Sequence, residues 1–285
     1  MKSSKFKVQG SKSAAERPFV FINCAISADG KLAPATRRYA PFGSARDAEM
    51  LYALRATADA IVCGARTIEQ SATLLGNGPE RFTRRRLRRG LSKHNLRVIV
   101  SGSGSVAPAS RIFQHRFSPL LVLTTERAGK KRLQRLRQLA DRVQICGENE
   151  IDFAGALAWL RREWGVKRLL CEGGGELNAS LLLAGLVDEV FVTVCPLVIG
   201  GRRAPTLADG LGVPRLAEAV ELELRSAKRV GDEMFLRYRV CAGEAGRHAG
   251  VSPAGRIGLF TTESWVWEEA ARPNPKARPR LNRPV

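Results

Sequence analysis

The sequence has little of what metal centres, disulfide frameworks and membrane spans need. Its 285 residues include three histidines, and the six cysteines stand singly, with no C-x-x-C pair. We therefore expect no metal site and no disulfide scaffold, and interpret the cysteines as small buried thiols of a reducing cytoplasm. No apolar run approaches the ~18 residues that a membrane helix needs. No hydrophobic segment follows the basic residues at 1–7, so we expect neither a secretory signal nor a membrane partner.

Acidic residues are also scarce, because 27 Asp and Glu face 47 Lys and Arg for a formal net charge of +20. Residues 81–97 carry eight bases and no acid, and their core at 84–89 has the composition of a nucleic-acid patch. Phe82 is the only Phe, Tyr or Trp in residues 81–97, so a stacking surface for single-stranded nucleic acid is not indicated. We favour a solvated insertion between a helix and a strand over nucleic-acid contact. A third interpretation is that part of residues 81–97 binds a substrate phosphate.

Three regions differ in composition. Residues 1–17 are rich in Lys, Ser and Gly without periodicity, which predicts a disordered basic arm. Residues 18–240 carry regular hydrophobic patterns and predict one α/β domain. Residues 241–285 hold five of the 14 prolines and end in Arg-Pro repetition, which predicts a largely disordered tail.

Short apolar runs alternate with helical patterns through the central region. The runs lie at 19–22, 60–63, 97–100, 120–124, 143–146, 168–171 and 189–195, and the candidate helix N-caps are Ser44 and Asp152. This alternation predicts a mainly parallel sheet that helices cover on both faces. Two late segments, 220–224 and 234–240, alternate residue by residue and predict an antiparallel edge.

The sharpest chemical feature is a glycine triplet, Gly173 to Gly175, between the apolar run 168–171 and a helix expected over 176–184. Glycines let a ligand approach the backbone, and the free N–H groups of a helix N-terminus suit a phosphate. The spacing is neither G-x-G-x-x-G nor a P-loop, because no Gly-Lys-Ser/Thr follows. The alternative is a tight turn that needs glycine only for its backbone angles.

Two further groups follow other strands. Asp29 and Lys31 stand in a turn after the first run, where ligands collect in open α/β sheets; the alternative is an ordinary surface turn. Thr67 follows Gly64 after the second run, and a threonine hydroxyl there is suited to a nucleotide. Arg55 has the planar fork that binds phosphate, although a salt-bridged helix residue is the commoner role.

In order along the chain, these motifs resemble the riboflavin-biosynthesis pyrimidine reductase family, the reductase half of the bacterial deaminase/reductase. The matching motifs are A-x-S-x-D-G-K at 25–31, L-R-A-x-x-D-A at 54–60, V-x-G-A-x-T at 62–67, E-G-G-x-x-L at 172–177, L-V-D-E at 186–189 and P-x-x-x-G-G at 196–201. The resemblance implies a dihydrofolate-reductase-like three-layer fold, NADPH, and a homodimer. It also implies hydride delivery to C1′ of the ring-opened ribosylamino group of a phosphoribosylamino-pyrimidine, which becomes ribitylamino.

Carried over position by position, the resemblance assigns roles to three sets of residues. Asp29 and Lys31 lie at the matching turn near the reaction site and are the catalytic candidates, without either being assigned as proton donor. The cofactor contacts are Ala25, Thr67, Ser71, Gly102, Gly174, Gly175, Glu176, Leu177, Asn178, Ala179 and Ser180. The substrate contacts are Tyr39, Arg55, Leu75, Arg81 and Glu172.

The chain departs from the family pattern after Thr67. Ser71 replaces an acidic nucleotide contact, and Gly78 replaces a substrate-side arginine for which Arg81 is a substitute. The deaminase motif H-x-E with P-C-x-x-C is absent. The pattern leaves open whether the pyrimidine is deaminated first. It also leaves two other functions open: a reductase of the same fold with another small substrate, and a non-enzymatic polyanion-binding protein that uses residues 81–97.

Overall fold

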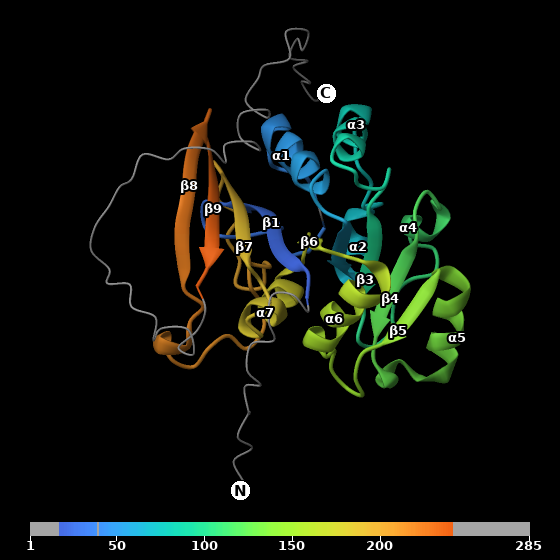
Figure 1. Cartoon of the computed structure of the whole chain (residues 1–285). Coiled ribbons are helices and arrows are strands. Elements are labelled where there is room, and N and C mark those ends of the chain that lie inside the picture. The colour runs from blue at the N-terminus through green and yellow to red at the C-terminus, as the bar shows by residue number, and fades with distance from the viewer. Residues whose placement is uncertain (1–16, 39, 242–285) are drawn as a thin grey trace, which may run out of the picture.

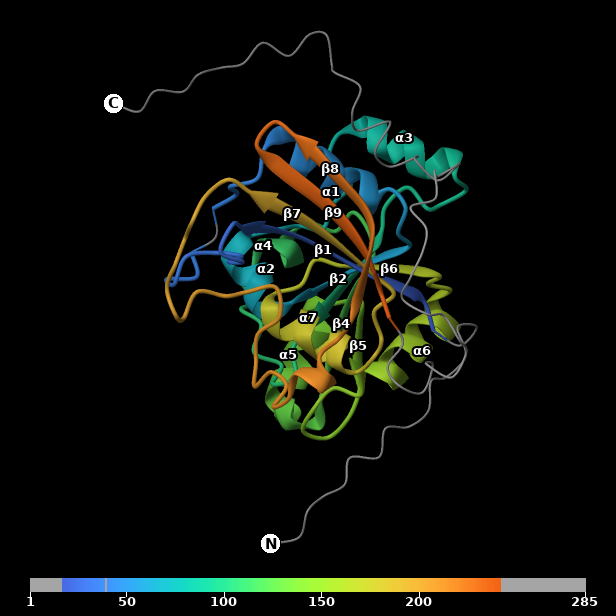
Figure 2. The ribbon, with the colours of Figure 1, turned by 90° about the vertical axis from the view of Figure 1, so that its left-hand side faces the viewer.

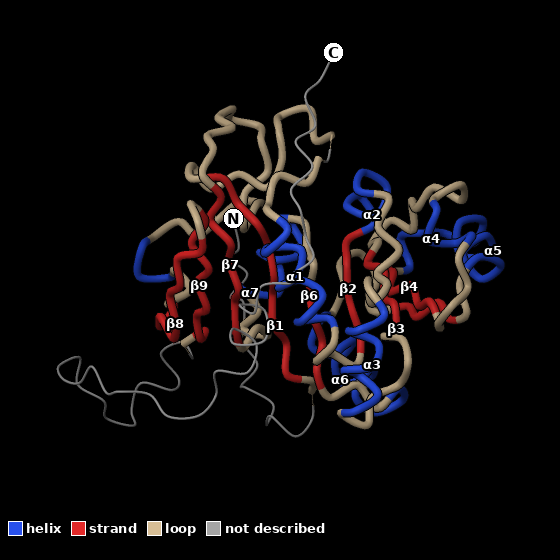
Figure 3. The backbone as a smooth tube through the Cα atoms, turned by 90° about the horizontal axis from the view of Figure 1, so that it is seen from above, coloured by secondary structure: helices blue, strands red, loops and turns tan. Residues whose placement is uncertain are grey.

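A computed structural model describes residues 17–38 and 40–241, and in it the expected α/β fold is confirmed. One sheet holds nine strands in the order β5-β4-β3-β2-β6-β1-β7-β9-β8, which Figure 3 shows from above. The strands are β1 (Phe19–Ser27), β2 (Ala60–Gly64), β3 (Leu96–Val100), β4 (Leu120–Thr124), β5 (Arg142–Ile145), β6 (Arg168–Cys171), β7 (Glu189–Cys195), β8 (Leu222–Val230) and β9 (Glu233–Val240).

The sheet is parallel from β5 to β7, and β9 is antiparallel to both β7 and β8. The predicted antiparallel edge is therefore confirmed, and Figure 2 shows it as a long hairpin beside β7. Because the seven parallel strands point one way, their carboxyl ends meet at one edge of the sheet. Ligands of open α/β proteins bind at that edge.

Helices cover both faces, as predicted. On one face α6 (Phe153–Trp164) and α7 (Gly175–Leu183) pack their apolar residues on the sheet, and Figure 1 shows them in the lower part of the molecule. The other face carries α1 (Ala45–Arg55), α2 (Ala65–Ser71), α4 (Arg111–Gln114) and α5 (Gly129–Leu139). Helix α3 (Glu80–Arg88) packs on α1 through Phe82. Short 3₁₀ turns lie at η1 (Glu126–Ala128) and η2 (Leu216–Glu218).

Local signals placed several helix ends correctly. Ser44 caps α1 by accepting hydrogen bonds from the N–H groups of Arg46 and Asp47, and Asp152 caps α6 by accepting from that of Gly155. These caps satisfy amides that lack a partner inside the helix. Helices α2 and α3 were not predicted. Each is short, and polar residues make up most of its sequence.

The basic segment 81–97 corrects our prediction of a solvated insertion. Residues 81–88 are helical, and the guanidinium of Arg86 is buried, where it donates to the carbonyls of Arg55, Ala58 and Ser92. Arg97, also buried, donates to the carbonyls of Ile112 and Ser118. These arginines satisfy buried backbone carbonyls at the ends of neighbouring elements, which charge counting along the sequence does not reveal.

The predicted arm and tail lie outside the described residues, except for Arg17 and Cys241. Arg17 forms two hydrogen bonds of 2.8 and 2.9 Å with the carboxylate of Asp188. Across 17–38 and 40–241, no helix combines the length and the apolar character that crossing a membrane requires.

Candidate active site

The carboxyl edge of the sheet brings together segments that are far apart in the sequence. The N–H group of Gly64, at the end of β2, donates to the carbonyl of Gly173, beyond β6, at 3.2 Å. The Thr67 hydroxyl donates to the same carbonyl at 3.1 Å. Figure 3 shows further loops grouped beyond the ends of β1 and β7. The glycine corner and the Gly64–Thr67 segment therefore form one structural unit.

Each glycine of the corner is needed for close packing. Gly173 and Gly174 have φ angles of 54° and 101°, which residues with a side chain rarely adopt. A Cβ on Gly174 would lie 2.6 Å from Thr67 Oγ1, and one on Gly175 would lie 2.6 Å from the carboxyl group of Asp209. The tight-turn interpretation is thus correct as far as it goes, and it does not exclude a ligand.

The N-terminus of α7 offers free amides. The first N–H group of the helix with a backbone acceptor is that of Asn178, which donates to the carbonyl of Gly174. Within the described chain, the N–H groups of Gly175, Glu176 and Leu177 donate to no protein atom. The carboxylate of Asp209 lies against Gly175 and adds negative charge there. A phosphate at this corner must therefore be held by cations in addition to the amides.

The six α7 residues assigned to the cofactor, 175–180, do not all face outward. Leu177, Asn178 and Ala179 are buried, and the Asn178 amide donates to the carbonyl of Leu207 at 2.9 Å. Glu176 and Ser180 are exposed, and Glu176 forms a 2.8 Å ion pair with Arg66. Contacts from this helix to a ligand must come from its backbone amides and its outward side chains.

Arg55 and Glu172, both assigned to the substrate, bind one another. Arg55 Nε and Nη2 donate to the two carboxylate oxygens of Glu172 at 2.6 Å each. Nη1 donates to the carbonyl of Gly76 at 2.5 Å. Both side chains are about nine-tenths buried. Burial is the largest single influence and lowers the pKa of Arg55, but the charge and hydrogen bonds of Glu172, with smaller contributions from Tyr52 and Cys63, together raise it overall.

Other assigned residues are spread more widely. Ala25 and Gly102 lie at or just beyond the ends of β1 and β3, and Ser71 ends α2 with its hydroxyl bound to the carbonyl of Thr67. Leu75 is fully buried in the core with a φ of 54°. Arg81 is paired with Glu49 on α1 and half exposed. Tyr39 lies outside the described residues.

The two catalytic candidates have structural roles. Asp29 accepts hydrogen bonds from the Ser27 hydroxyl and from the N–H groups of Ile199 and Gly200. These bonds, that from Ser27 first, lower the pKa of Asp29 to about 2, so it is ionised at neutral pH. Lys31 forms a β-bridge with Thr206 through its backbone. Both residues tie the loop after β1 to the loop after β7.

Sequence reasoning missed a cluster of two carboxyl groups, Asp47 and Glu233, on the α1 face of the sheet. Asp47, in the first turn of α1, accepts a hydrogen bond from Thr193, and its pKa is raised by burial and by the nearby charge of Glu233. Glu233 is buried and accepts hydrogen bonds from the backbone and hydroxyl of Ser44. Thr193 pairs with Ala25 across β1 and β7, so this cluster adjoins a predicted cofactor contact. No sequence pattern indicates that α1, β7 and β9 come together at this point.

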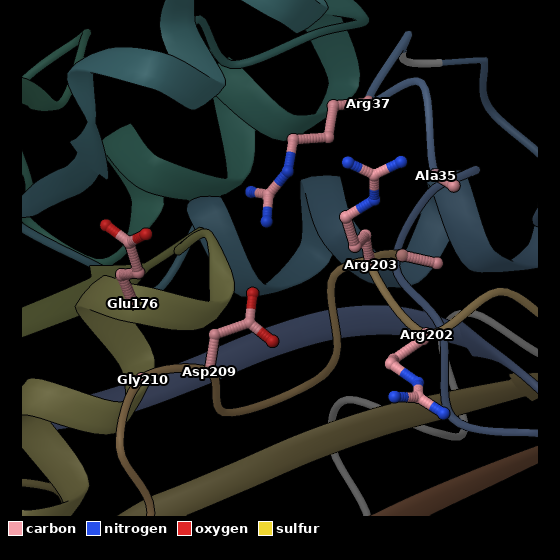
Figure 4. Close-up of a pocket in the computed structure, with 8 residues that line it drawn as sticks. Ala35, Arg37, Glu176, Arg202, Arg203, Asp209 and Gly210 are labelled. Carbon is pink, nitrogen blue, oxygen red and sulfur yellow. The ribbon is translucent and has the colours of Figure 1, made fainter.

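A cavity of about 590 Å³ opens between the two tied loops and the start of α7. Its lining includes three arginines and two acids, namely Arg37, Arg202, Arg203, Glu176 and Asp209. Figure 4 shows the guanidinium groups of Arg37 and Arg203 projecting into the same space, whereas that of Arg202 points away. Among the described residues, no group of three or more His, Cys, Asp or Glu side chains is placed to hold a metal ion.

A glycine–helix corner and a cationic cavity at the carboxyl edge of a parallel sheet are typical of α/β proteins that bind phosphorylated ligands. The chain belongs to the RibD C-terminal domain family, which matches residues 18–236. It is 34% identical over 224 residues to the 2,5-diamino-6-ribosylamino-4(3H)-pyrimidinone 5′-phosphate reductase of Methanothermobacter thermautotrophicus, covering 79% of this chain and 99% of that one. The protein of the same name from Aquifex aeolicus is 28% identical over 229 residues, which cover 79% of this chain and 97% of that one.

Solved structures share the fold. A pyrimidine reductase-like protein of Corynebacterium diphtheriae superposes with a TM-score of 0.67 at 23% identity, covering 80% of this chain and 94% of that one. Acinetobacter baumannii RibD gives a TM-score of 0.62 at 19% identity over 79% of this chain. The match spans 58% of that longer protein. The three-layer fold predicted from the sequence, that of dihydrofolate reductase, is therefore confirmed.

Proposed function

We propose that this protein is the NADPH-dependent reductase of riboflavin biosynthesis that converts the ribosylamino side chain of a pyrimidine 5′-phosphate to ribitylamino. The observation that carries the proposal is the match over nearly the whole length of reductases that bear this name, together with a glycine–helix corner at the carboxyl edge of the sheet. The named relatives act on a 2,5-diaminopyrimidinone, which favours the substrate that still carries its 2-amino group.

The residues present fit a dinucleotide. The corner has three glycines with no room for a side chain and helix amides without protein acceptors. Thr67, Gly174 and Gly175 would hold the cofactor there, with Ala25 and Gly102 on either side. When bound, the cofactor supplies the hydride for C1′. The role of the protein is to hold C1′ next to the bound cofactor and to exclude water from that space.

The chain must also supply a proton, because reduction of the ring-opened C1′=N bond places a hydride on carbon and a proton on nitrogen. Asp29 is ionised and committed to three hydrogen bonds. We propose Asp47 as the donor. Its carboxyl lies beside Thr193 and Glu233, one strand from Ala25, and the raised pKa favours the protonated form. Ionised Asp47 then takes a proton back from solvent.

The experiment is a stopped-flow or steady-state assay of NADPH oxidation with the phosphoribosylamino-pyrimidine, in its diamino form and in its deaminated form. We expect turnover with NADPH, little with NADH, and a preference for the diamino form. NADPH binding without turnover of either pyrimidine would instead favour a reductase of this fold with another substrate. Failure to bind NADPH at all would contradict the proposal.

We also propose a homodimer in the cytoplasm. The outer strand β8 has no neighbour on its free side among the described residues, and it begins with two exposed apolar residues, Leu222 and Leu224. Such an edge needs cover in a stable protein. The six cysteines are free thiols, as a reducing compartment requires. Light scattering on the purified protein measures the oligomeric state directly.

A further inference from the structure

The cavity between the two loops has the charge pattern of a site for a sugar phosphate. Arg37 and Arg203 direct their guanidinium groups into one space, and neither forms an ion pair within the described part of the chain. Two like charges that face each other are unfavourable without an anion between them. The acids on the other wall do not pair with these arginines. Glu176 pairs with Arg66 through Oε1 and Asp209 accepts from Thr206 through Oδ1, so the second oxygen of each carboxylate can accept from a ligand.

The loops that carry the two arginines are tied to one another through their backbones. The two loops are joined by the β-bridge from Lys31 to Thr206 and by the hydrogen bond from the N–H group of Leu32 to the carbonyl of Pro205. A Cβ on Gly201 would touch Ala35 at 3.4 Å, so the loops pack closely beside Arg202. An anion that binds between these loops therefore avoids the entropic penalty of ordering their backbones.

Arg37 itself has a strained backbone. Its φ of 57° lies in the left-handed region, and its N–H group closes a turn onto the carbonyl of Pro34 at 2.8 Å. A residue with a long side chain is uncommon there, and such strain is concentrated at ligand sites. The turn sends this side chain across the mouth of the cavity, where Figure 4 shows it between Glu176 and Arg203.

The usual cations of the corner are not free to bind phosphate. The fork of Arg55 is used by Glu172 and Gly76, and Arg81 is paired with Glu49. Gly78 stands where the family pattern has an arginine, and a Cβ there would collide with the ring of Tyr52. Asp209 places a carboxylate at the start of α7. A phosphorylated ligand therefore needs cations from another part of the edge, and the cavity supplies them.

We propose that Arg37 and Arg203 bind the phosphate of a ribose phosphate, with Glu176 and Asp209 on the opposite wall accepting hydrogen bonds from sugar hydroxyls. The inference rests on the proposed function, because that function supplies two ribose phosphates: the 5′-phosphate end of the pyrimidine substrate and the nicotinamide ribose phosphate of the cofactor. A guanidinium forms paired, charge-assisted hydrogen bonds with either phosphate.

The variants Arg37→Ala and Arg203→Ala test the site against two controls. Arg202→Ala removes a charge from the same lining but a guanidinium that points away, and Arg162→Ala removes an exposed arginine of α6. Calorimetric titration with ribose 5-phosphate should show binding to the wild-type protein that weakens about tenfold in each test variant, the loss expected for one charge-assisted hydrogen bond. The controls should change it by less than about twofold. Melting temperatures check that all four variants fold.

Two further measurements identify the source of the phosphate. If the cofactor is the ligand, the test variants raise the Kd for NADPH and leave the KM for the pyrimidine unchanged. If the substrate is the ligand, they raise that KM about tenfold, leave the Kd for NADPH unchanged, and have no effect on turnover of a dephosphorylated pyrimidine.

The outcomes separate this inference from the proposed function. Ribose 5-phosphate binding that depends on Arg37 and Arg203 supports the site even in a protein that fails to oxidise NADPH. Wild-type reductase activity in a folded protein, with ribose 5-phosphate, NADPH and substrate binding all unchanged by Arg37→Ala and Arg203→Ala, overturns the site and leaves the proposed function standing. Absence of ribose 5-phosphate binding to the wild-type protein also counts against the site.

Discussion

Arg55 and Glu172, 117 residues apart in the chain, are joined by two hydrogen bonds of 2.6 Å inside the protein. Their pairing ties the end of α1 to the end of β6, and so fixes the glycine corner relative to the helix that crosses the other face. Two residues that family resemblance assigns to the substrate thus act as one structural unit. A substrate that reaches them meets a neutral pair and no free arginine.

Replacement of Glu172 by Ala should destabilise the protein strongly. It leaves the Arg55 guanidinium buried with one carbonyl partner, and loss of one partner of a buried pair costs about 3–5 kcal/mol. Urea denaturation measures the free energy of unfolding. The double variant Arg55→Met/Glu172→Leu, which removes both charges, should recover much of the loss. If the single variant is as stable as the wild type, the pair contributes nothing to the fold.

Gly174→Ala should abolish cofactor binding and lower stability. The new Cβ would lie 2.6 Å from Thr67 Oγ1, on a residue whose φ is 101°. Gly185 is the matched control, because its φ is 67° and nothing lies within 4 Å of an added Cβ. Gly185→Ala should cost about 1 kcal/mol from backbone strain alone. Equal effects of the two substitutions on NADPH binding would mean that the corner does not hold the cofactor.

The sequence predicted the fold well because the signals involved are local or repeated. Seven apolar runs that alternate with helical patterns indicated a parallel sheet, and caps such as Ser44 marked where helices begin. Long-range pairing left no such mark. Charge patterning around Arg86 predicted solvation, yet the structure buries this side chain against backbone carbonyls from the turn after α1 and from Ser92. Likewise, no spacing rule joins Asp47 to Glu233.

The contribution of Arg86 to stability can be separated from its charge. Arg86→Met should destabilise the protein by about 1–3 kcal/mol, because it removes three hydrogen bonds from a buried guanidinium. The Ser92 carbonyl loses its donor, whereas those of Arg55 and Ala58 keep the side-chain amide of Asn95. Arg84, on the exposed side of the same helix, is the control, and Arg84→Met should have an effect of less than about 0.5 kcal/mol. Thermal unfolding of both variants provides the measurement. Similar melting temperatures for the two would restore the prediction of a solvated basic segment.

Asp29 should stabilise the two tied loops in a pH-dependent way. Its pKa is lowered from 3.8 to about 2, so the native state favours the ionised carboxylate more than the unfolded chain does. The contribution is therefore complete above pH 3.8 and is lost as the pH falls through about 2. Asp29→Asn should melt at a lower temperature than the wild type at pH 7, with a difference that shrinks toward pH 2. A difference that does not depend on pH would contradict the assignment.

Asp47 should show the opposite dependence. Burial and Glu233 raise its pKa, so the native state holds this proton more tightly than the unfolded chain. Ionised Asp47 then destabilises the fold at pH values above its native pKa, and the penalty disappears as the pH falls below the unfolded value. Asp47→Asn, which is neutral at every pH, should gain stability relative to the wild type as the pH rises above 3.8 in a titration of melting temperature. Because Asp47 is the proposed proton donor, Asp47→Asn should also lose at least about a hundredfold in kcat, with little change in the Kd for NADPH. Because a purely structural role predicts the stability change without the selective loss of kcat, the two measurements together decide whether this carboxyl takes part in the chemistry.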